Sequence, residues 1–234
     1  MLHTQDLQSG YGKMHVLHGI DFMIKSGEII AIIGPNGSGK STFLKSIFGL
    51  CDIYSGNIIW MNKNITKLKT YEKISEGIAY VPQGRQIFRN LTTHENLEIG
   101  TYSIKDRRLA KKRIKTVYEK FPYLRDKRDK IADTLSGGQQ QILSIGRALI
   151  LNPQLLLVDE PSLGLSPKAT KMVFKKIQEL NKEGVSVIIV EQNIKAATEI
   201  ANQIYVFENG RVVLKGQKDI LKNPMIKNVY FGGK

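Results

Sequence analysis

The residues whose types and spacing are best suited to chemistry lie at positions 34–41, which read GPNGSGKS. Glycines have no Cβ, so this loop can wrap closely around an anion and point its N–H groups at it. Lys40 can reach the terminal phosphates of a nucleotide, and the Ser41 hydroxyl can hold Mg²⁺. The pattern predicts a nucleoside-triphosphate site, against the alternative of a glycine-rich turn with an incidental lysine. Its expected ligand-binding residues are Gly34, Pro35, Asn36, Gly37, Ser38, Gly39, Lys40, Ser41 and Thr42.

A pair of adjacent carboxylates, Asp159 and Glu160, follows the apolar run 155–158. Beside a phosphate loop such a pair divides the work: Asp159 holds the Mg²⁺ shell and Glu160 orients an attacking water. The alternative role for the pair is a helix cap. Gln83 follows the apolar run 78–81 and faces the ligand-binding edge of the sheet, unless it only satisfies backbone groups of its loop.

A second anion site is predicted at residues 135–141, which read LSGGQQQ and open a helix expected to run through Ile150. Ser136 suits an N-cap, and the glycines at 137 and 138 let another group approach the helix start closely. A helix N-terminus attracts anions through its free N–H groups and its dipole. The sequence offers this helix start no obvious anion of its own.

Short apolar runs must position these residues. Ile29–Ile33 and 155–158 are unbroken aliphatic runs, typical of strands buried on both faces of a parallel sheet, and 78–81 and 185–190 are further expected strands. Helices are expected at 42–48, 70–75, 167–180 and 196–201. A hairpin is expected around Asn209 and Gly210. The sequence therefore predicts an α/β fold.

The remaining segments predict two additions to this core. Residues 1–7 and 16–24 are expected strands joined by a turn at 9–12, with an edge strand at 57–60. From residue 85 to about 134, Leu, Ile and Tyr recur at helical spacing amid heavy charge, which indicates an inserted helical subdomain. We expect a single domain over 1–234, with a core at 1–84 and 154–234 and a helical subdomain at 85–153.

Composition limits the cellular setting but does not identify a partner. The chain has 234 residues, a formal net charge of +14 and a single cysteine, Cys51. No signal peptide and no apolar run of membrane-spanning length are visible, so we expect a soluble, cytoplasmic protein. The charge is compatible with nucleic acid, with an anionic membrane surface, or with lysines spread over solvated faces. For the basic run 105–115 we favour an exposed helix face over a patch that faces lipid headgroups.

Together these motifs resemble the ATP-binding-cassette ATPases over essentially the whole chain. Residues 135–139 look like the signature of that family, and 155–160 look like its Walker B segment. The resemblance implies a P-loop NTPase core of the RecA-like kind with an N-terminal antiparallel β subdomain. It also implies that Tyr11 stacks on adenine beside Val16, that Gln83 joins Ser41 and Asp159 around Mg²⁺, and that ATP is the nucleotide. Family cassettes pair head to tail, so Ser136, Gly137, Gly138 and Gln139 would meet the γ-phosphate held by the other subunit, with residues 162–165 crossing between them.

Finer features resemble the LivF-like subgroup, whose members serve branched-chain amino-acid importers. The stretches that carry this resemblance are 80–85, 159–165, 190–193 and 230–233. It implies a second ATPase subunit of the LivG type or a second copy, two membrane permeases, an external solute-binding protein, and a peripheral position on the inner face of the membrane. Gln192 stands where most cassettes have a histidine; its amide can bind the γ-phosphate but carries no charge. Gln83 stands where many LivF-like chains have glutamate.

We therefore expect a transport ATPase, with Glu160, Lys40 and Gln192 as the catalytic residues. Importers of urea or short amides are an alternative within the same subgroup. A nucleic-acid or ribosome-associated cassette is the rival suggested by the charge, but no sustained heptads and no second ATPase domain appear in the sequence. A purely regulatory nucleotide-binding module is a third alternative, disfavoured because the full set from Lys40 to Glu160 is present.

Overall fold

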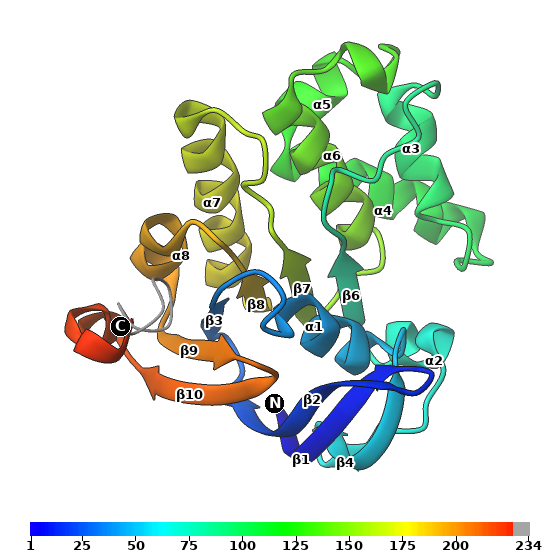
Figure 1. Cartoon of the computed structure of the whole chain (residues 1–234). Coiled ribbons are helices and arrows are strands. Elements are labelled where there is room, and N and C mark those ends of the chain that lie inside the picture. The colour runs from blue at the N-terminus through cyan, green and yellow to red at the C-terminus, as the bar shows by residue number, and fades with distance from the viewer. Residues whose placement is uncertain (227–234) are drawn as a thin grey trace.

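A six-stranded sheet forms the centre of the protein in the computed structural model, which describes residues 1–226 (Figure 1). Its strand order is β10-β9-β3-β8-β7-β6, and all neighbours are parallel except the β9–β10 pair. The strands are β3 (Ile29–Ile33), β6 (Ile78–Val81), β7 (Leu155–Asp159), β8 (Ser186–Val190), β9 (Gln203–Glu208) and β10 (Arg211–Gly216). The four strands that the aliphatic runs predict are thus present, and the α/β fold is confirmed.

Side chains on the two faces of this sheet enter separate cores because successive strand residues point to opposite sides. Ile30 and Ile32 pack with the buried side of helix α1 (Lys40–Phe48) and with the N-terminal strands. Ile29 lies on the other face with Val187 and Ile189, where helices α6 (Gly137–Leu149) and α7 (Pro167–Lys182) cover the sheet. Because β3 is buried over all five residues, its sequence needs no polar alternation.

A four-stranded antiparallel sheet covers α1 on the side away from the central sheet (Figure 1). Its order is β2-β1-β4-β5, from strands β1 (Leu2–Tyr11), β2 (Met14–Ile24), β4 (Asp52–Trp60) and β5 (Lys63–Asn64). The expected antiparallel subdomain is confirmed. The expected edge strand at 57–60 is wrong in position, because β4 begins at Asp52 and β5 pairs with its last two residues.

The expected turn at residues 9–12 is also wrong, because β1 continues to Tyr11 and the chain reverses at residues 12–13. Ser9 points inward and its hydroxyl lies 2.6 Å from that of Ser46 on α1, which holds the strand in place. Gly10 pairs with His15 across the hairpin, and a Cβ at residue 10 would lie 1.9 Å from the carbonyl oxygen of Met14. Glycine is needed here for close approach of two strands, not for a turn.

Helices occupy the chain between β6 and β7, as the composition shift predicts. They are α3 (Thr93–Ile99), α4 (Arg107–Lys120), α5 (Pro122–Asp126), the 3-10 turn η1 (Ala132–Thr134) and α6. The first residue of the basic run, Lys105, and most of its successors on α4 are exposed, while Ile114 and Val117 face the core. This agrees with an exposed helix face. The division of the chain at residues 84, 85, 153 and 154 stays a prediction.

The remaining elements lie around the central sheet, with α2 (Thr70–Ser75) against β6, α8 (Ile194–Ile200) against β3 and α7, and η2 (Lys218–Lys222) against β9 and β10. The predicted hairpin is formed by β9 and β10. Across residues 1–226, none of the helices has both the length and the apolar character that a membrane crossing requires. The sequence feature at 230–233 lies outside the described residues.

Candidate nucleotide site

The carboxyl ends of four parallel strands bring the predicted site residues to one edge of the central sheet. The phosphate loop follows β3, Gln83 follows β6, and Asp159 ends β7. Gln192 comes two residues after β8. Ligands of open α/β sheets bind at this edge, and the sequence pattern predicts that the residues meet here.

The phosphate loop is shaped by close contacts that only glycine allows. Gly34 has φ 153°, and a Cβ there would lie 2.2 Å from the carbonyl oxygen of Phe207. Gly39 has φ 95° and serves as the N-cap residue of α1 without a side chain. The loop therefore presents bare backbone N–H groups and the positive end of α1 on its open side.

Lys40 lies folded over the loop that precedes it. Its Nζ donates to the carbonyl oxygens of Gly34 and Pro35, at 2.9 and 2.8 Å. Burial lowers the pKa of Lys40, while the carboxylates of Glu160 and Asp159 oppose that shift. Beside it the hydroxyl of Ser38 is buried and has no hydrogen-bond partner among the described residues. A buried, unsatisfied hydroxyl in an anion-binding loop fits a ligand with acceptor oxygens, as phosphate has.

Asp159 is held by hydroxyl groups on both of its oxygens. Ser41 Oγ donates to Oδ1 at 2.8 Å, and the Tyr80 hydroxyl donates to Oδ2 at 2.9 Å. Burial raises the pKa of Asp159, and the two hydroxyl donors counteract that rise. The Asp159 side chain is thus fixed next to the Ser41 hydroxyl, which is the pair expected to hold Mg²⁺.

The Glu160 carboxylate accepts hydrogen bonds from the two glutamines predicted to lie at the site. Gln83 Nε2 donates to Oε2 and Gln192 Nε2 donates to Oε1, each at 2.8 Å. The backbone of Glu160 has φ 44°, a left-handed conformation that costs about 1–3 kcal/mol outside glycine. A strained, buried carboxylate held by two amides is arranged for a role beyond packing, and strand β7 alone does not require this conformation.

Tyr11 and Val16 lie beside the start of α1. The Tyr11 hydroxyl lies 3.5 Å from the hydroxyl of Thr42, and the side chain is 39% exposed. A Cβ built on Gly39 would lie 3.6 Å from Val16 Cγ1, so Val16 flanks the loop. An exposed aromatic side chain next to the loop is compatible with base stacking, and that role stays a prediction.

The start of α6 carries the cap that the sequence predicts. Ser136 Oγ accepts from the backbone of Gln139 at 3.4 Å, and the backbone N–H of Ser136 donates to the Gln139 side chain at 3.1 Å. Both glycines allow side chains of this same chain to approach closely. A Cβ at Gly137 would lie 2.5 Å from Arg85 Nη1, and one at Gly138 would lie 2.9 Å from the Cβ of Ala169 on α7.

A cavity of about 710 Å³ opens at this helix start. It is lined by Ser136, Gly137, Gly138, Gln139, Gly164 and Leu165, among others, and by no residue of the phosphate loop. The two predicted anion sites therefore belong to separate surfaces of one chain.

The oxygen atoms at the sheet edge suit a Mg²⁺ ion that takes only one or two ligands from the protein. Residues 1–226 contain no group of three or more His, Cys, Asp or Glu side chains able to hold a metal. Mg²⁺ commonly takes one or two protein oxygens and completes its shell with substrate phosphates and water. The Ser41 and Asp159 oxygens, which are hydrogen-bonded to each other, suit that mode.

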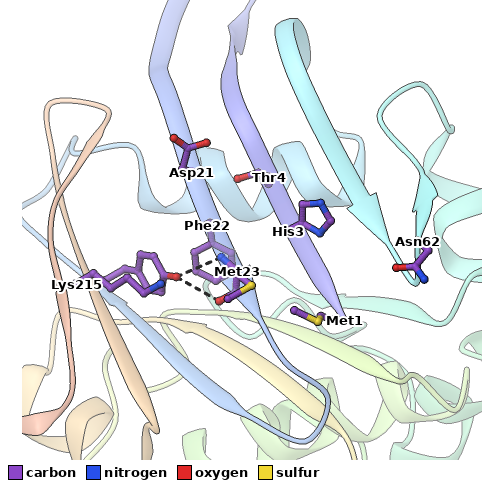
Figure 2. Close-up of a pocket in the computed structure, with 9 residues that line it drawn as sticks. Met1, His3, Thr4, Asp21, Phe22, Met23, Asn62 and Lys215 are labelled. Atoms are coloured by element: carbon purple, nitrogen blue, oxygen red, sulfur yellow. Dashed lines mark hydrogen bonds between the residues drawn. The ribbon is translucent and has the colours of Figure 1, made fainter.

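Another cavity, of about 480 Å³, lies between the two sheets, as Figure 2 shows. Its lining includes His3, Asp21, Phe22 and Lys215, and also Tyr205, whose hydroxyl is hydrogen-bonded to the backbone of Met23 at 3.2 Å. It shares no residue with the sheet edge described above. The nucleotide site is therefore not this cavity.

Comparison with known proteins fits the geometry of the sheet edge. The family model described as ABC transporter matches residues 17–163, more than half of the chain. The chain belongs to the ABC transporter family. It is an ATP-binding-cassette ATPase, and cassettes of this family bind nucleotide.

Curated relatives match the cassette over its full length. It is 41% identical to the high-affinity branched-chain amino acid transport ATP-binding protein BraG of Pseudomonas aeruginosa, with 100% of each chain covered. It is 39% identical to the probable branched-chain amino acid transport ATP-binding protein LivF of Archaeoglobus fulgidus, with 99% of each covered. It is also 31% identical to the lipopolysaccharide export system ATP-binding protein LptB of Escherichia coli, covering 99% of this chain and 97% of the other.

Solved structures share the fold of the cassette. A structure described as the ADP conformation of an ATP-binding cassette of an ABC transporter has a TM-score of 0.91 at 30% identity, covering 100% of this chain and 99% of the other. A dimeric cassette in a post-hydrolysis state bound to ADP and Pi has a TM-score of 0.80 at 26% identity, covering 93% of this chain and 99% of that one.

The sequence does not predict a site role for two residues, Tyr80 and Glu191, that the structure places near the site. Tyr80 sits inside the run 78–81, where alternation shows only that it faces one side of the sheet, and its bond to Asp159 spans 79 positions. Glu191 follows β8 and binds Ser162, 29 positions earlier. A polar side chain at a strand end of an open α/β sheet was the available signal for Glu191. For Tyr80 a hydroxyl within a buried strand was the only sign.

Proposed function

We propose that this cassette is an ATP-binding subunit of an importer for branched-chain amino acids. The proposal is supported by the full-length similarity to BraG and LivF, whose names state that role. Gln192 supports the same subgroup by resemblance, because most cassettes have histidine at that position. ATP hydrolysis at the sheet edge would drive uptake through permease subunits.

The observation that carries the mechanism is the separation of the two anion sites on one chain. The cavity at Ser136 is lined by no residue of the phosphate loop, and we infer that a single copy does not place both on one nucleotide. A second cassette that faces the first head to tail would bring its Ser136 to the γ-phosphate. A related cassette described as a dimer bound to ADP and Pi supports the pairing of two cassettes.

Each residue at the sheet edge has a task in that mechanism. Lys40 and the loop N–H groups bind the phosphates, and Tyr11 holds the base. Glu160 accepts a proton from the attacking water while Gln83 and Gln192 keep its carboxylate in place. Mg²⁺ held by Ser41, Asp159 and Gln83 would neutralise phosphate charge when bound. Closure of the pair then gates the reaction, as lids do in other enzymes.

The proposed partners follow from the same arrangement. They are a LivG-like ATPase subunit or a second copy, two integral membrane permeases and, indirectly, an external solute-binding protein. The helical segment 85–153 and the Gln83 loop would pass the motion of the core, 1–84 and 154–234, to a permease. The cassette would lie in the cytoplasm against the inner face of the membrane.

Two alternatives remain for the cargo and the partner. The similarity to LptB, whose name states lipopolysaccharide export, extends over almost the full length of both chains, and an importer for urea or short amides has the same ATPase requirements. A nucleic-acid partner is the alternative that the net charge of +14 suggests.

Co-expression with candidate branched-chain amino-acid permease subunits from the same organism tests the proposal. We expect the cassette to co-purify with the permeases, and vesicles that hold the complex should take up labelled leucine, isoleucine or valine only with ATP. Uptake of urea instead would favour the first alternative. Salt-dependent binding to duplex DNA at micromolar affinity, without permease binding, would contradict the importer.

A further inference from the structure

Glu191 is a buried carboxylate to which the proposed mechanism gives no task. It follows β8 directly and is only 1% exposed. Ser162 donates to both of its oxygens: the backbone N–H to Oε1 and the hydroxyl to Oε2, each at 2.8 Å. Oε2 also accepts the backbone N–H groups of Gln192 and Asn193 at 3.1 Å. Four donors converge on one buried carboxylate.

The nature of these partners shows why the residue must be a carboxylate. All four groups are donors, and a carboxylate is an acceptor on both oxygens. Burial raises the pKa of Glu191, and the donors from Ser162 and the following backbone oppose that rise. An amide in its place would turn an NH₂ group toward an N–H or O–H donor. The link that Glu191 makes between the two segments would then be broken, and both would be less firmly held.

Glu191 joins two segments with different surroundings. Ser162 opens the segment 162–165, and its residues Gly164 and Leu165 line the cavity at Ser136. Gln192 holds Glu160 through Oε1 at 2.8 Å. The chain of contacts thus runs from the wall of the Ser136 cavity, through Glu191, to the carboxylate expected to act on water.

We propose that Glu191 is a positioning residue that fastens the segment 162–165 to the loop of Gln192, so that both move as one unit. The inference rests on the proposed function for its consequence: a neighbouring cassette that presses on 162–165 would shift Gln192 and thereby set Glu160. Binding of the neighbouring cassette and correct placement of Glu160 for hydrolysis are then coupled through Glu191.

Hydrogen exchange on the isolated chain tests the link without any transporter. Glu191→Gln should speed exchange of the backbone amides of Ser162, Gln192 and Asn193 together, by roughly 10- to 100-fold, as expected when buried bonds to a charged group are lost. Ser162→Ala removes one donor and keeps the carboxylate, so it serves if Glu191→Gln folds poorly. It should speed exchange at Gln192 and Asn193 by a smaller factor.

Glu95→Gln is the matched control. The exposed Glu95 carboxylate accepts the backbone N–H and the hydroxyl of Thr92 at 2.7 and 2.8 Å, so it meets the same donor types as Glu191 but only within the N-terminal cap of α3. Its exchange effects should stay near Thr92. Faster exchange in only one of the two segments after Glu191→Gln would overturn the proposal, and so would unchanged exchange in both.

Turnover by the assembled complex separates positioning from simple support of the fold. Glu191→Gln should lower kcat by roughly 10- to 100-fold through misplacement of Glu160, with KM for ATP within about twofold of the native value. Glu191→Asp keeps the charge and should recover part of kcat. A native kcat for Glu191→Gln would refute the link to Glu160. If the complex transported a different solute, the expected exchange and turnover results would be unchanged. The positioning role of Glu191 and the importer assignment can therefore fail separately.

Discussion

Tyr80→Phe removes one hydroxyl and tests the metal end of the site. The ring remains, so its packing against Phe48, with ring centroids 5.4 Å apart, is kept. The lost bond is a 2.9 Å donation to a carboxylate that is 1% exposed. Hydrogen bonds to charged groups contribute about 1.5–3 kcal/mol, and groups that orient a metal ligand affect metal affinity about 10- to 100-fold.

We therefore expect the Mg²⁺ concentration for half-maximal ATP hydrolysis to rise roughly 10- to 100-fold. At saturating Mg²⁺, kcat should return to within a few-fold of native, because Glu160 is held by Gln83 and Gln192 and not by Tyr80. A Mg²⁺ titration of turnover by the assembled complex measures both quantities.

Tyr118→Phe is the control for this experiment. Its hydroxyl is bonded to His94 Nδ1 at 2.8 Å, within the helical segment and away from the sheet edge. The control should leave the Mg²⁺ dependence unchanged. If Tyr80→Phe also left it unchanged, Asp159 would not depend on Tyr80 for its orientation and the reasoning would be refuted.

Three further substitutions test separate parts of the account. Glu160→Gln should slow turnover by roughly 10²–10⁴ with ATP binding intact; equal turnover in the assembled complex would remove Glu160 from its role. Tyr11→Ala should weaken ATP binding by about 1–3 kcal/mol if the ring stacks on the base, and an unaltered Kd would leave Tyr11 a structural residue. Lys73→Met should raise the free energy of unfolding at pH 7 by up to about 3 kcal/mol, because burial lowers the pKa of Lys73 from 10.5 to about 8. As the pH rises from about 8 to 10.5, the unfolded chain holds more protons than the native protein, so the free energy of unfolding of the native protein increases. The difference in stability between Lys73→Met and the native protein should therefore shrink over this range. Urea unfolding that showed a constant difference would contradict this reasoning.

The sequence was sufficient where local pattern and chemistry coincide. The aliphatic run at Ile29–Ile33, the glycine loop and α1 follow one another as predicted, because each depends on neighbouring residues only. The bounds of α2 and β6 also agree with the prediction. Asp159, Glu160, Gln83 and Gln192 meet because parallel strands share one carboxyl edge, a rule that needs no knowledge of distances.

The sequence was insufficient where a residue's role depends on a distant partner. Gly10 lies among residue types that are common in turns, yet it belongs to strand β1. Glycine is present there because a Cβ would collide with the carbonyl oxygen of Met14. Gly56 sits inside β4 with φ 84°, at the point where the register with β1 shifts, so the start of that strand was missed. Glu191 and Tyr80 are hydrogen-bonded to residues far along the chain, and no local spacing predicts such contacts.

Cysteine crosslinking across the pair of cassettes tests the central claim most directly. With Cys51 replaced by serine, Ser136→Cys in this chain would be paired with a cysteine in the phosphate loop of the neighbouring ATPase subunit, Asn36→Cys if that subunit is a second copy. We predict a disulfide between the subunits in the assembled complex with ATP and Mg²⁺, and much less with ADP. A complex that hydrolyses ATP and never forms this crosslink with any nucleotide would contradict the shared site.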